Sequence, residues 1–401
     1  MYINNKKRNI KRIAGTLIVL YLLLYTLGPA ILSDTSASLT FAKMSLILLM
    51  TVVFVINYGR KDLGVMNFVV SGLLLFVFIQ FLVFRNYEVF KVVGINVFVY
   101  YIFARYCNKD YIPFFSEGLK FCTLLVVLSV LWLCIESGTL EYDRGGALID
   151  KSFITGLLGL SYIYIVVDIF YHKRLFVNIC LLLLFVFVNL MIIQSKISVA
   201  VLLICILFLY LVSEDRIRKE MQKYFFCILA LGVVFVIILP NKLNLLGDDI
   251  KYAVNILTGN NIFDDFIRSE ERMDMTYNIR HDLWEYCIHQ LFMENILLGI
   301  GVGNAGMYIS RIYDWLSETE SSLLSIITEG GIVYAVLMFS FFYINIRQSY
   351  IALKKEQTQE YYYPLLIFIA YVIMIIGNDF LDSLFWIQTG AMTGVILHSK
   401  R

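Results

Sequence analysis

Cationic and acidic side chains gather in one polar stretch, residues 241–318, of an otherwise apolar chain. This stretch carries Arg272, Arg280 and Arg311 among many carboxylates, and Glu320 follows it at the start of the next apolar segment. An arginine fork suits phosphate oxygens, and a carboxylate in a partly dehydrated site has a raised pKa and accepts protons. These residue types indicate chemistry at a membrane surface.

Two further cations stand in short polar connections. Arg144 precedes a Gly-Gly pair, which permits close backbone approach to a ligand, although the arginine also has Asp143 and Glu141 beside it as ion-pair partners. Lys196 lies in the turn QSKIS, where a lysine either extends toward lipid headgroups or helps to hold an anionic one. Both cations are candidates for phosphate binding.

The segment 278–299 has a helical period, with Arg280 and Trp284 one turn apart, a spacing that allows both side chains to flank the same ligand. Three residues on another face, His281, Glu285 and His289, follow at intervals of four, but no HExxH pattern is present. We therefore interpret that face as solvated, and we expect no metal and no cofactor.

Glycines and two glutamates follow that helix. The run GIGVGNAG (299–306) predicts a tight turn whose backbone lies close to a substrate or a helix, because no strand precedes it as a nucleotide loop requires. Glu320 is either a general base or a favourable charge at a helix N-terminus. For Glu329, beside Gly330-Gly331, we expect a hydrogen bond to another helix.

The composition predicts a membrane protein. Of the 401 residues, 60% are hydrophobic and only 16% are charged, and a net charge of +2 does not favour nucleic acid as a partner. Apolar segments long enough to cross a bilayer must be helical there, because a helix satisfies its own backbone polar groups. We expect an all-α polytopic protein with about 12 transmembrane helices, at residues 13–32, 39–57, 65–84, 88–104, 112–135, 152–171, 175–193, 197–212, 222–240, 319–346, 361–377 and 383–398.

The distribution of Lys and Arg predicts the orientation. With alternating spans, most of these cations fall on the side of the two termini, whereas short connections such as 33–38 and 377–383 on the other side carry almost none. The positive-inside rule places both termini in the cytoplasm and residues 241–318 outside. We expect transmembrane helices in 1–240 and 319–401, joined by an extracytoplasmic loop at 241–318 that contains amphipathic membrane-surface helices.

Three segments resemble the O-antigen polymerase and ligase superfamily, the Wzy-type enzymes of bacterial polysaccharide assembly. RGGALIDKSFITG (144–156) is similar to the family's Arg-Gly segment ahead of a span, and QSKISVAVLL (194–203) is similar to its Ser-Arg/Lys turn. The block from Arg280 through Trp284 and GIGVG to ETESSLLSIITEGGIVYAV (318–336) is similar to its Arg…Trp…Gly-x-Gly…His…Leu…Glu-Gly pattern. One departure is that many relatives carry His where this sequence has Glu320 or a close neighbour.

The resemblance implies a metal-independent glycosyltransferase of the GT-C kind in the bacterial plasma membrane. Its donor would be a glycan on undecaprenyl pyrophosphate, and a terminal sugar hydroxyl of another lipid-linked repeat would attack at the outer leaflet. Arg144 and Arg280 would bind the pyrophosphate, with Arg272, Arg311 and Lys196 as secondary candidates. Glu320 would take the proton, unless the base lies elsewhere, and Trp284 and Glu329 would have structural roles. Further partners would be a flippase and a chain-length regulator.

Two other functions fit this pattern. A ligase would move finished glycan from the same lipid to a different acceptor. A transporter or flippase of lipid-linked oligosaccharide belongs to another class, in which repeated halves and broken helices near the bilayer midplane are common. No internal duplication is visible here, which favours the transferase.

Overall fold

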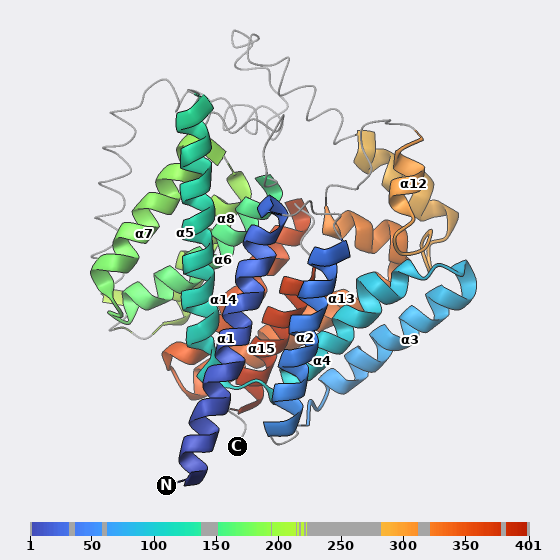
Figure 1. The fold of residues 1–401 in the computed structure, drawn as a ribbon. Coiled ribbons are helices and arrows are strands. Elements are labelled where there is room, and N and C mark those ends of the chain that lie inside the picture. The colour runs from blue at the N-terminus through green and yellow to red at the C-terminus, as the bar shows by residue number, and fades with distance from the viewer. Residues whose placement is uncertain are drawn as a thin grey trace. The chain divides into compact units, whose positions relative to one another are not determined.

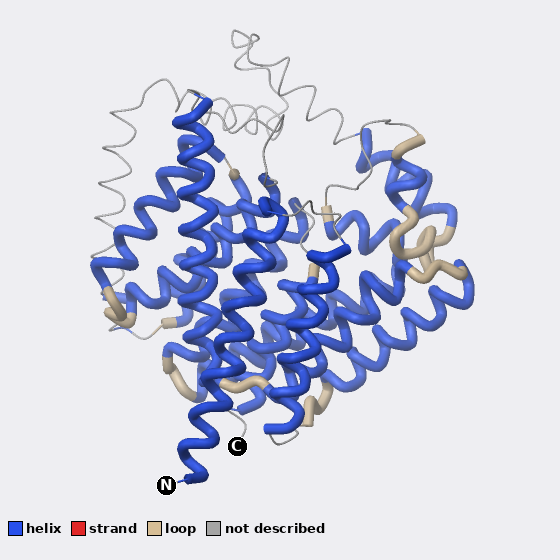
Figure 2. Tube along the Cα trace, viewed as in Figure 1, coloured by secondary structure: helices blue, strands red, loops and turns tan. Residues whose placement is uncertain are grey.

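A computed structural model describes residues 2–31, 37–57, 62–137, 151–193, 195–213, 215, 218–219, 222, 282–311, 321–377 and 382–398. The chain divides into two compact units, one formed by residues 1–212 with 291–401 and the other by residues 213–290. Figure 2 shows helices joined by short turns, and no strand occurs among the described residues.

The larger unit is a bundle of helices, and helices far apart in the sequence, such as α4 and α15, pack side by side in it (Figure 1). Its elements are α1 (Tyr2–Ile31), α2 (Ala37–Asn57), α3 (Met66–Phe84), η1 (Phe90–Gly94), α4 (Ile95–Tyr106), η2 (Lys109–Tyr111), α5 (Ile112–Ser137), α6 (Lys151–Phe170), α7 (Leu175–Val188), η3 (Asn189–Ile193), α8 (Lys196–Val212), α12 (Ala305–Ile309), α13 (Ser322–Lys355), α14 (Gln359–Gly377) and α15 (Ser383–His398). The π-helix η5 (Cys287–Phe292) spans the boundary between the two units. The helix α1 begins and α15 ends at the same end of this bundle, which we call the terminal end; the opposite end is the distal end.

Seven helices in the described part are long and apolar enough to cross a membrane, which confirms an all-α polytopic membrane protein. They cover Ile10–Gly28, Ser38–Val55, Met66–Phe84, Lys109–Glu136, Lys151–Phe170, Ser322–Lys355 and Gln359–Ile376, and three shorter apolar helices cover Leu175–Val188, Lys196–Val212 and Ser383–Leu397. The span predicted at 88–104 is divided between η1 and α4, and the one at 222–240 lies outside the described residues, apart from residue 222. The total of twelve and the GT-C-like fold stay predictions.

The core of the larger unit lies around α6, α14 and α15. Of the membrane-spanning segment of each helix, 89% is buried inside the protein in α6 and 78% in α14, whereas only 22% is buried in α2 and 33% in α3. The outward faces of α2 and α3 carry exposed Phe, Leu and Val side chains, as expected for surfaces that contact lipid tails.

Small residues bring α15 against α4. A Cβ added at Gly390 would lie 2.7 Å from the Tyr100 carbonyl oxygen, and one at Gly394 would lie 2.6 Å from the Cys107 carbonyl oxygen. This spacing of four is the small-xxx-small pattern with which membrane helices approach closely. The hydroxyl of Thr393 donates to Asn345 Oδ1 (2.7 Å) and lies 3.0 Å from the Tyr100 hydroxyl, which adds α13 to the same joint.

Buried hydrogen bonds also set the height of α15 relative to α6 and α14. Gln388 of α15 donates to the hydroxyl of Tyr164 on α6 (3.0 Å) and accepts from the hydroxyl of Tyr371 on α14 (2.6 Å). Because these three side chains are buried and paired with one another, sliding one helix along the others would leave polar groups unsatisfied. The three helices are therefore fixed in register.

Candidate functional site

Hydroxyl groups tie the distal ends of α13, α14 and α15 to one another and to α1. The hydroxyl of Tyr21 on α1 lies 2.6 Å from that of Ser383, the first residue of α15. Ser321 caps α13, and its hydroxyl donates to the Ile376 carbonyl at the end of α14 (2.8 Å). The beginnings of α13 and α15 and the end of α14 thus meet beside α1.

This meeting point is recessed from the distal end of α6. The helices α6 and α15 run in the same direction from the distal end. Tyr164 of α6 and Gln388 of α15 lie at the same depth in the bundle, because they are hydrogen-bonded to each other. At about 1.5 Å per residue, about 7 Å of helix separates Ser383 from Gln388, whereas about 20 Å separates Lys151 from Tyr164. The beginning of α15 therefore lies deeper in the bundle than the beginning of α6, which in the sequence follows the loop that carries Arg144.

Asp382 brings a carboxylate to this recessed position. Its Oδ1 accepts a hydrogen bond from the backbone N–H of Phe385 in the first turn of α15 (3.0 Å). Burial raises the pKa of Asp382 to about 6, and backbone hydrogen bonds oppose this rise only in part. A carboxylate that is ionised near neutral pH and binds protons slightly below it is suited to accept a proton from a substrate hydroxyl.

We expect the raised pKa of Asp382 to appear in the pH dependence of stability. Because the folded protein binds this proton more tightly than the unfolded chain does, the unfolding midpoint should fall as the pH rises from about 3.8 to about 6. Asp382→Asn keeps a side chain that caps helices and should lose this component. Thermal unfolding against pH measures it, with Asp110→Asn, at a carboxylate paired with Lys11 on the surface, as the control. Identical pH profiles for wild type and Asp382→Asn would contradict the assignment.

Lys196 begins α8 and is exposed at the distal end of the bundle. Ser195 precedes it and is held by the Asn189 side chain, whose Oδ1 accepts from Ser195 N (3.2 Å), and its own hydroxyl accepts from Ser198 N (3.4 Å). These bonds fix the first turn of α8, where the positive end of the helix dipole and a cation together favour an anion.

The glycine turn, Gly299–Gly303, lies on a break in α13. At Gly331 the helix has φ 64° and ψ −166°, and the residues around it bond to the turn instead of to their own helix. Ile300 N donates to Thr328 O (3.0 Å) and Gly301 N to Glu329 O (3.0 Å), while Ile332 N donates to Ile296 O (2.9 Å). The sequence predicts that the backbone of this turn lies close to a substrate or to a helix, and the structure shows it lying against the helix α13.

Polar side chains hold the turn from two sides. Glu329 Oε1 accepts from Ala305 N (2.9 Å) at the beginning of α12, which confirms the predicted hydrogen bond to another helix. On the other side Gln80 donates to Leu298 O (2.5 Å) and Asn86 donates to Val302 O (3.0 Å), both from the distal end of α3 and the residues after it. Glu329 therefore positions backbone in this structure.

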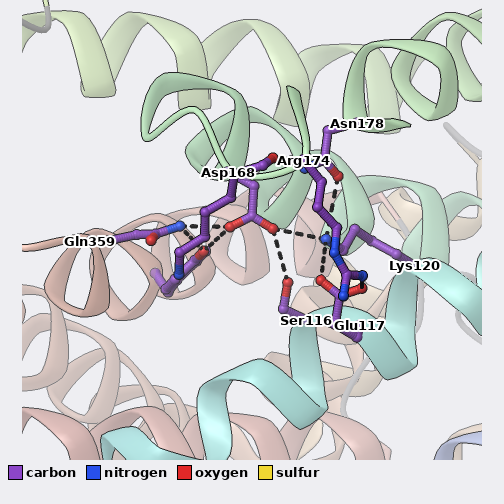
Figure 3. A network of polar contacts seen from close by, with 9 residues as sticks. Ser116, Glu117, Lys120, Asp168, Arg174, Asn178 and Gln359 are labelled. Atoms are coloured by element: carbon purple, nitrogen blue, oxygen red, sulfur yellow. Dashed lines mark hydrogen bonds and ion pairs between the residues drawn. The ribbon is translucent and has the colours of Figure 1, made fainter. Parts of the chain in front are cut away.

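A second polar centre, shown in Figure 3, joins α5, α6 and α14 near the end of α6. Lys120 of α5 and Asp168 of α6 form an ion pair of 2.8 Å with both side chains 5% exposed. Asp168 also accepts from Gln359 and Tyr363 of α14 (both 2.6 Å). Glu117, which is half-exposed, bonds to Lys120 (2.9 Å) and to Arg174 (2.9 Å), and Asn178 Oδ1 also accepts from Lys120 (3.3 Å). Each charge in this network is paired, which is what a structural joint requires.

The predicted site residues fall in different places. Arg144, Arg272, Arg280 and Glu320 lie outside the described residues. Arg311 is exposed, with its guanidinium 5.4 Å from the centre of the Tyr308 ring, and Trp284 is half-buried in the unit 213–290. Among the described residues no group of three or more His, Cys, Asp or Glu side chains is placed to hold a metal ion.

Sequence reasoning missed the recessed residues Tyr21, Ser321, Asp382 and Ser383. The only signal for them was the acidic connection GNDFLDS (377–383), which appeared in the sequence as a loop poor in Lys and Arg. Hydroxyl groups of single Ser and Tyr residues in apolar segments give no pattern from which their pairing can be read.

Comparison with known proteins gives one match. Residues 179–339 match a family model described as O-antigen ligase. The matched region runs from α7 into α13 and includes Lys196, Trp284, the glycine turn and Glu329. No curated protein matches the chain. The match confirms the resemblance to the O-antigen polymerase and ligase superfamily.

Proposed function

On the premise that residues 179–339 form a region of the O-antigen ligase family, we propose that this membrane enzyme extends a bacterial polysaccharide. It transfers glycan from undecaprenyl pyrophosphate to the terminal sugar hydroxyl of another lipid-linked repeat unit at the outer leaflet of the plasma membrane. The family match is the observation that supports the proposal most strongly, because the matched region contains both the turn QSKIS with Lys196 and the glycine turn.

The reaction requires charge stabilisation on the leaving group. The acceptor oxygen forms a bond to the anomeric carbon while the bond from that carbon to the pyrophosphate oxygen breaks, and undecaprenyl pyrophosphate departs with the electron pair. Arginines stabilise the negative charge that develops on such a group. We assign this role to Arg144 and Arg280, with Arg272, Arg311 and Lys196 as secondary cations.

The acceptor hydroxyl must lose a proton as it attacks. We assign the role of accepting this proton to Glu320, which directly precedes Ser321, the cap residue of α13, in the sequence. Asp382 is a second carboxylate near that cap, because Ser321 bonds to the end of α14 and Asp382 stands shortly after it. Either carboxylate, once ionised, accepts the proton without a metal ion.

A ligase is the second candidate, because the matched family model is itself described as O-antigen ligase. The two reactions share the donor and the leaving group and differ only in the acceptor. A ladder of lengthened lipid-linked glycans identifies the polymerase, whereas attachment of one preformed glycan to a different acceptor identifies the ligase.

Arg280→Ala should abolish polymer while the protein still inserts into the membrane. A neutral side chain leaves the departing pyrophosphate without its guanidinium, and loss of one such electrostatic contact lowers the rate about 10²–10³-fold. The measurement is the length distribution of polysaccharide from cells that carry the variant, with the amount of membrane-inserted protein measured in parallel. Arg218→Ala, at an exposed arginine that is 3.5 Å from Asp215, is the control and should leave polymer unchanged. Normal polymer length in Arg280→Ala would remove Arg280 from the mechanism.

A further inference from the structure

A buried arginine that has no counter-ion among the described residues lies at the terminal end of the bundle. Arg105 is in the last turn of α4 and is only 8% exposed. Its Nε atom is buried and has no hydrogen-bond partner in the described part of the chain, and the guanidinium carbon lies 4.6 Å from the centre of the Tyr101 ring. Among the residues that the structure describes, the Tyr101 ring is the only group in a cation–π or ionic contact with the guanidinium.

Carboxylates close to Arg105 along the chain or on neighbouring connections are already engaged. Asp110 of η2 pairs with Lys11 of α1 (3.3 Å). Asp62, which precedes α3, accepts from Gly64 N (3.1 Å) and from Asn67 (2.9 Å). A cation withdrawn from water without an anion is costly, so the position calls for an anion from outside the described chain.

The position of Arg105 is also fixed by packing. The absent side chain of Gly394 lets α15 lie against the last turn of α4, where a Cβ would be 3.2 Å from the Ala104 carbonyl oxygen and 2.6 Å from that of Cys107. Arg105 is therefore a cation held in place between packed helices, unlike a surface lysine that moves freely toward water. A guanidinium that is oriented in advance favours a planar, two-point contact with a phosphate or carboxylate group.

The surroundings indicate which anion. The helix α4 packs against α2, and the last two turns of α2 carry the exposed side chains of Val52 and Val55, so α4 ends near lipid. The terminal end is the side on which the positive-inside rule collects cations, and Lys109 is exposed four residues further on. Anionic headgroups gather at such a surface.

We propose that Arg105 binds the phosphate of an anionic lipid headgroup in the leaflet at the terminal end, with Tyr101 supporting the guanidinium. This site is separate from the transferase site at the distal end and does not depend on the proposed reaction. Its occupant completes the charge balance at the end of α4 and fixes the joint between α4 and α15.

The test compares unfolding midpoints of the full-length protein in nanodiscs of phosphatidylcholine alone and of phosphatidylcholine with phosphatidylglycerol. We expect phosphatidylglycerol to raise the midpoint of the wild type, Arg105→Gln to lose most of this rise, and Arg105→Lys to keep part of it. Lys354→Gln is the matched control, because Lys354 is an exposed cation stacked on Tyr350 (5.0 Å) in the last turn of α13, and it should keep the full rise.

Two outcomes would overturn the proposal. One is an equal rise with phosphatidylglycerol in wild type and Arg105→Gln. The other is a full rise caused by inorganic phosphate in phosphatidylcholine nanodiscs, because the site would then take a soluble anion. Should Arg105→Gln fail to fold, the comparison of wild type with Arg105→Lys, together with native mass spectrometry of the retained lipid, gives the same decision.

Discussion

Lys120→Met should prevent the protein from accumulating in a folded state, whereas Lys120→Met combined with Asp168→Asn should restore it. Methionine retains most of the volume of the lysine stem but leaves the Asp168 carboxylate charged, buried and without its cation. Removing one partner of a buried pair costs about 3–5 kcal/mol. The double variant removes both charges, and the asparagine oxygen still accepts from Gln359 and Tyr363.

The measurement is the unfolding midpoint of purified protein, together with its yield as a single species on size-exclusion chromatography. Arg174→Ala is the control, because this arginine is 71% exposed in its pair with Glu117 and exposed pairs contribute about 0.2–1 kcal/mol. A Lys120→Met protein as stable as Arg174→Ala would show that Asp168 does not need its cation. Failure of the double variant to recover would show that the pair does more than balance charge.

Gly331→Val should disrupt the glycine turn and with it the distal part of α13. The backbone of Gly331 has φ 64° and ψ −166°, a conformation that residues other than glycine almost never adopt, and a Cβ there would lie 2.5 Å from the Gly299 nitrogen and 2.6 Å from the Leu297 carbonyl oxygen. Backbone strain costs about 1–3 kcal/mol and crowding of a packed site costs a similar amount, so the loss is about 2–6 kcal/mol.

Gly64→Ala provides the matched control for this variant. Gly64 also has a positive φ (55°), but a Cβ there would meet nothing within 4 Å, so only the conformational cost of about 1 kcal/mol applies. Limited proteolysis after residue 311 and the unfolding midpoint should separate the two variants. Equal stability of Gly331→Val and Gly64→Ala would mean that the contact of the turn with α13 contributes nothing.

The sequence predicted most of the helices because the bilayer allows few alternatives. A segment such as 151–170 is apolar over its length, and lipid leaves only a helix for it. The glycine turn was also predicted as a tight turn, because no strand precedes GIGVG. The break at Gly331 could not be predicted, because it depends on the backbone of a turn 32 residues earlier bonding to it.

Pairing between distant polar residues was beyond sequence reasoning for the same reason. The positive-inside rule groups Lys120 with the other cytoplasmic cations, whereas the structure pairs it with Asp168 on the next helix. Periodicity does not show which way Asp168 points, because its helix is almost wholly buried. Asp382 was missed because its chemistry arises from burial at the meeting of helix ends. The roles of Arg144, Arg272, Arg280 and Glu320 stay predictions.

The most direct measurement of the proposed function is the size of the product when purified protein is incubated with a defined oligosaccharide on undecaprenyl pyrophosphate. Without nucleotide, metal ion or ion gradient, the account predicts a ladder of longer lipid-linked glycans and an equal release of undecaprenyl pyrophosphate, both absent with Arg280→Ala. Substrate that keeps its original length in the presence of well-folded wild-type protein would contradict the account.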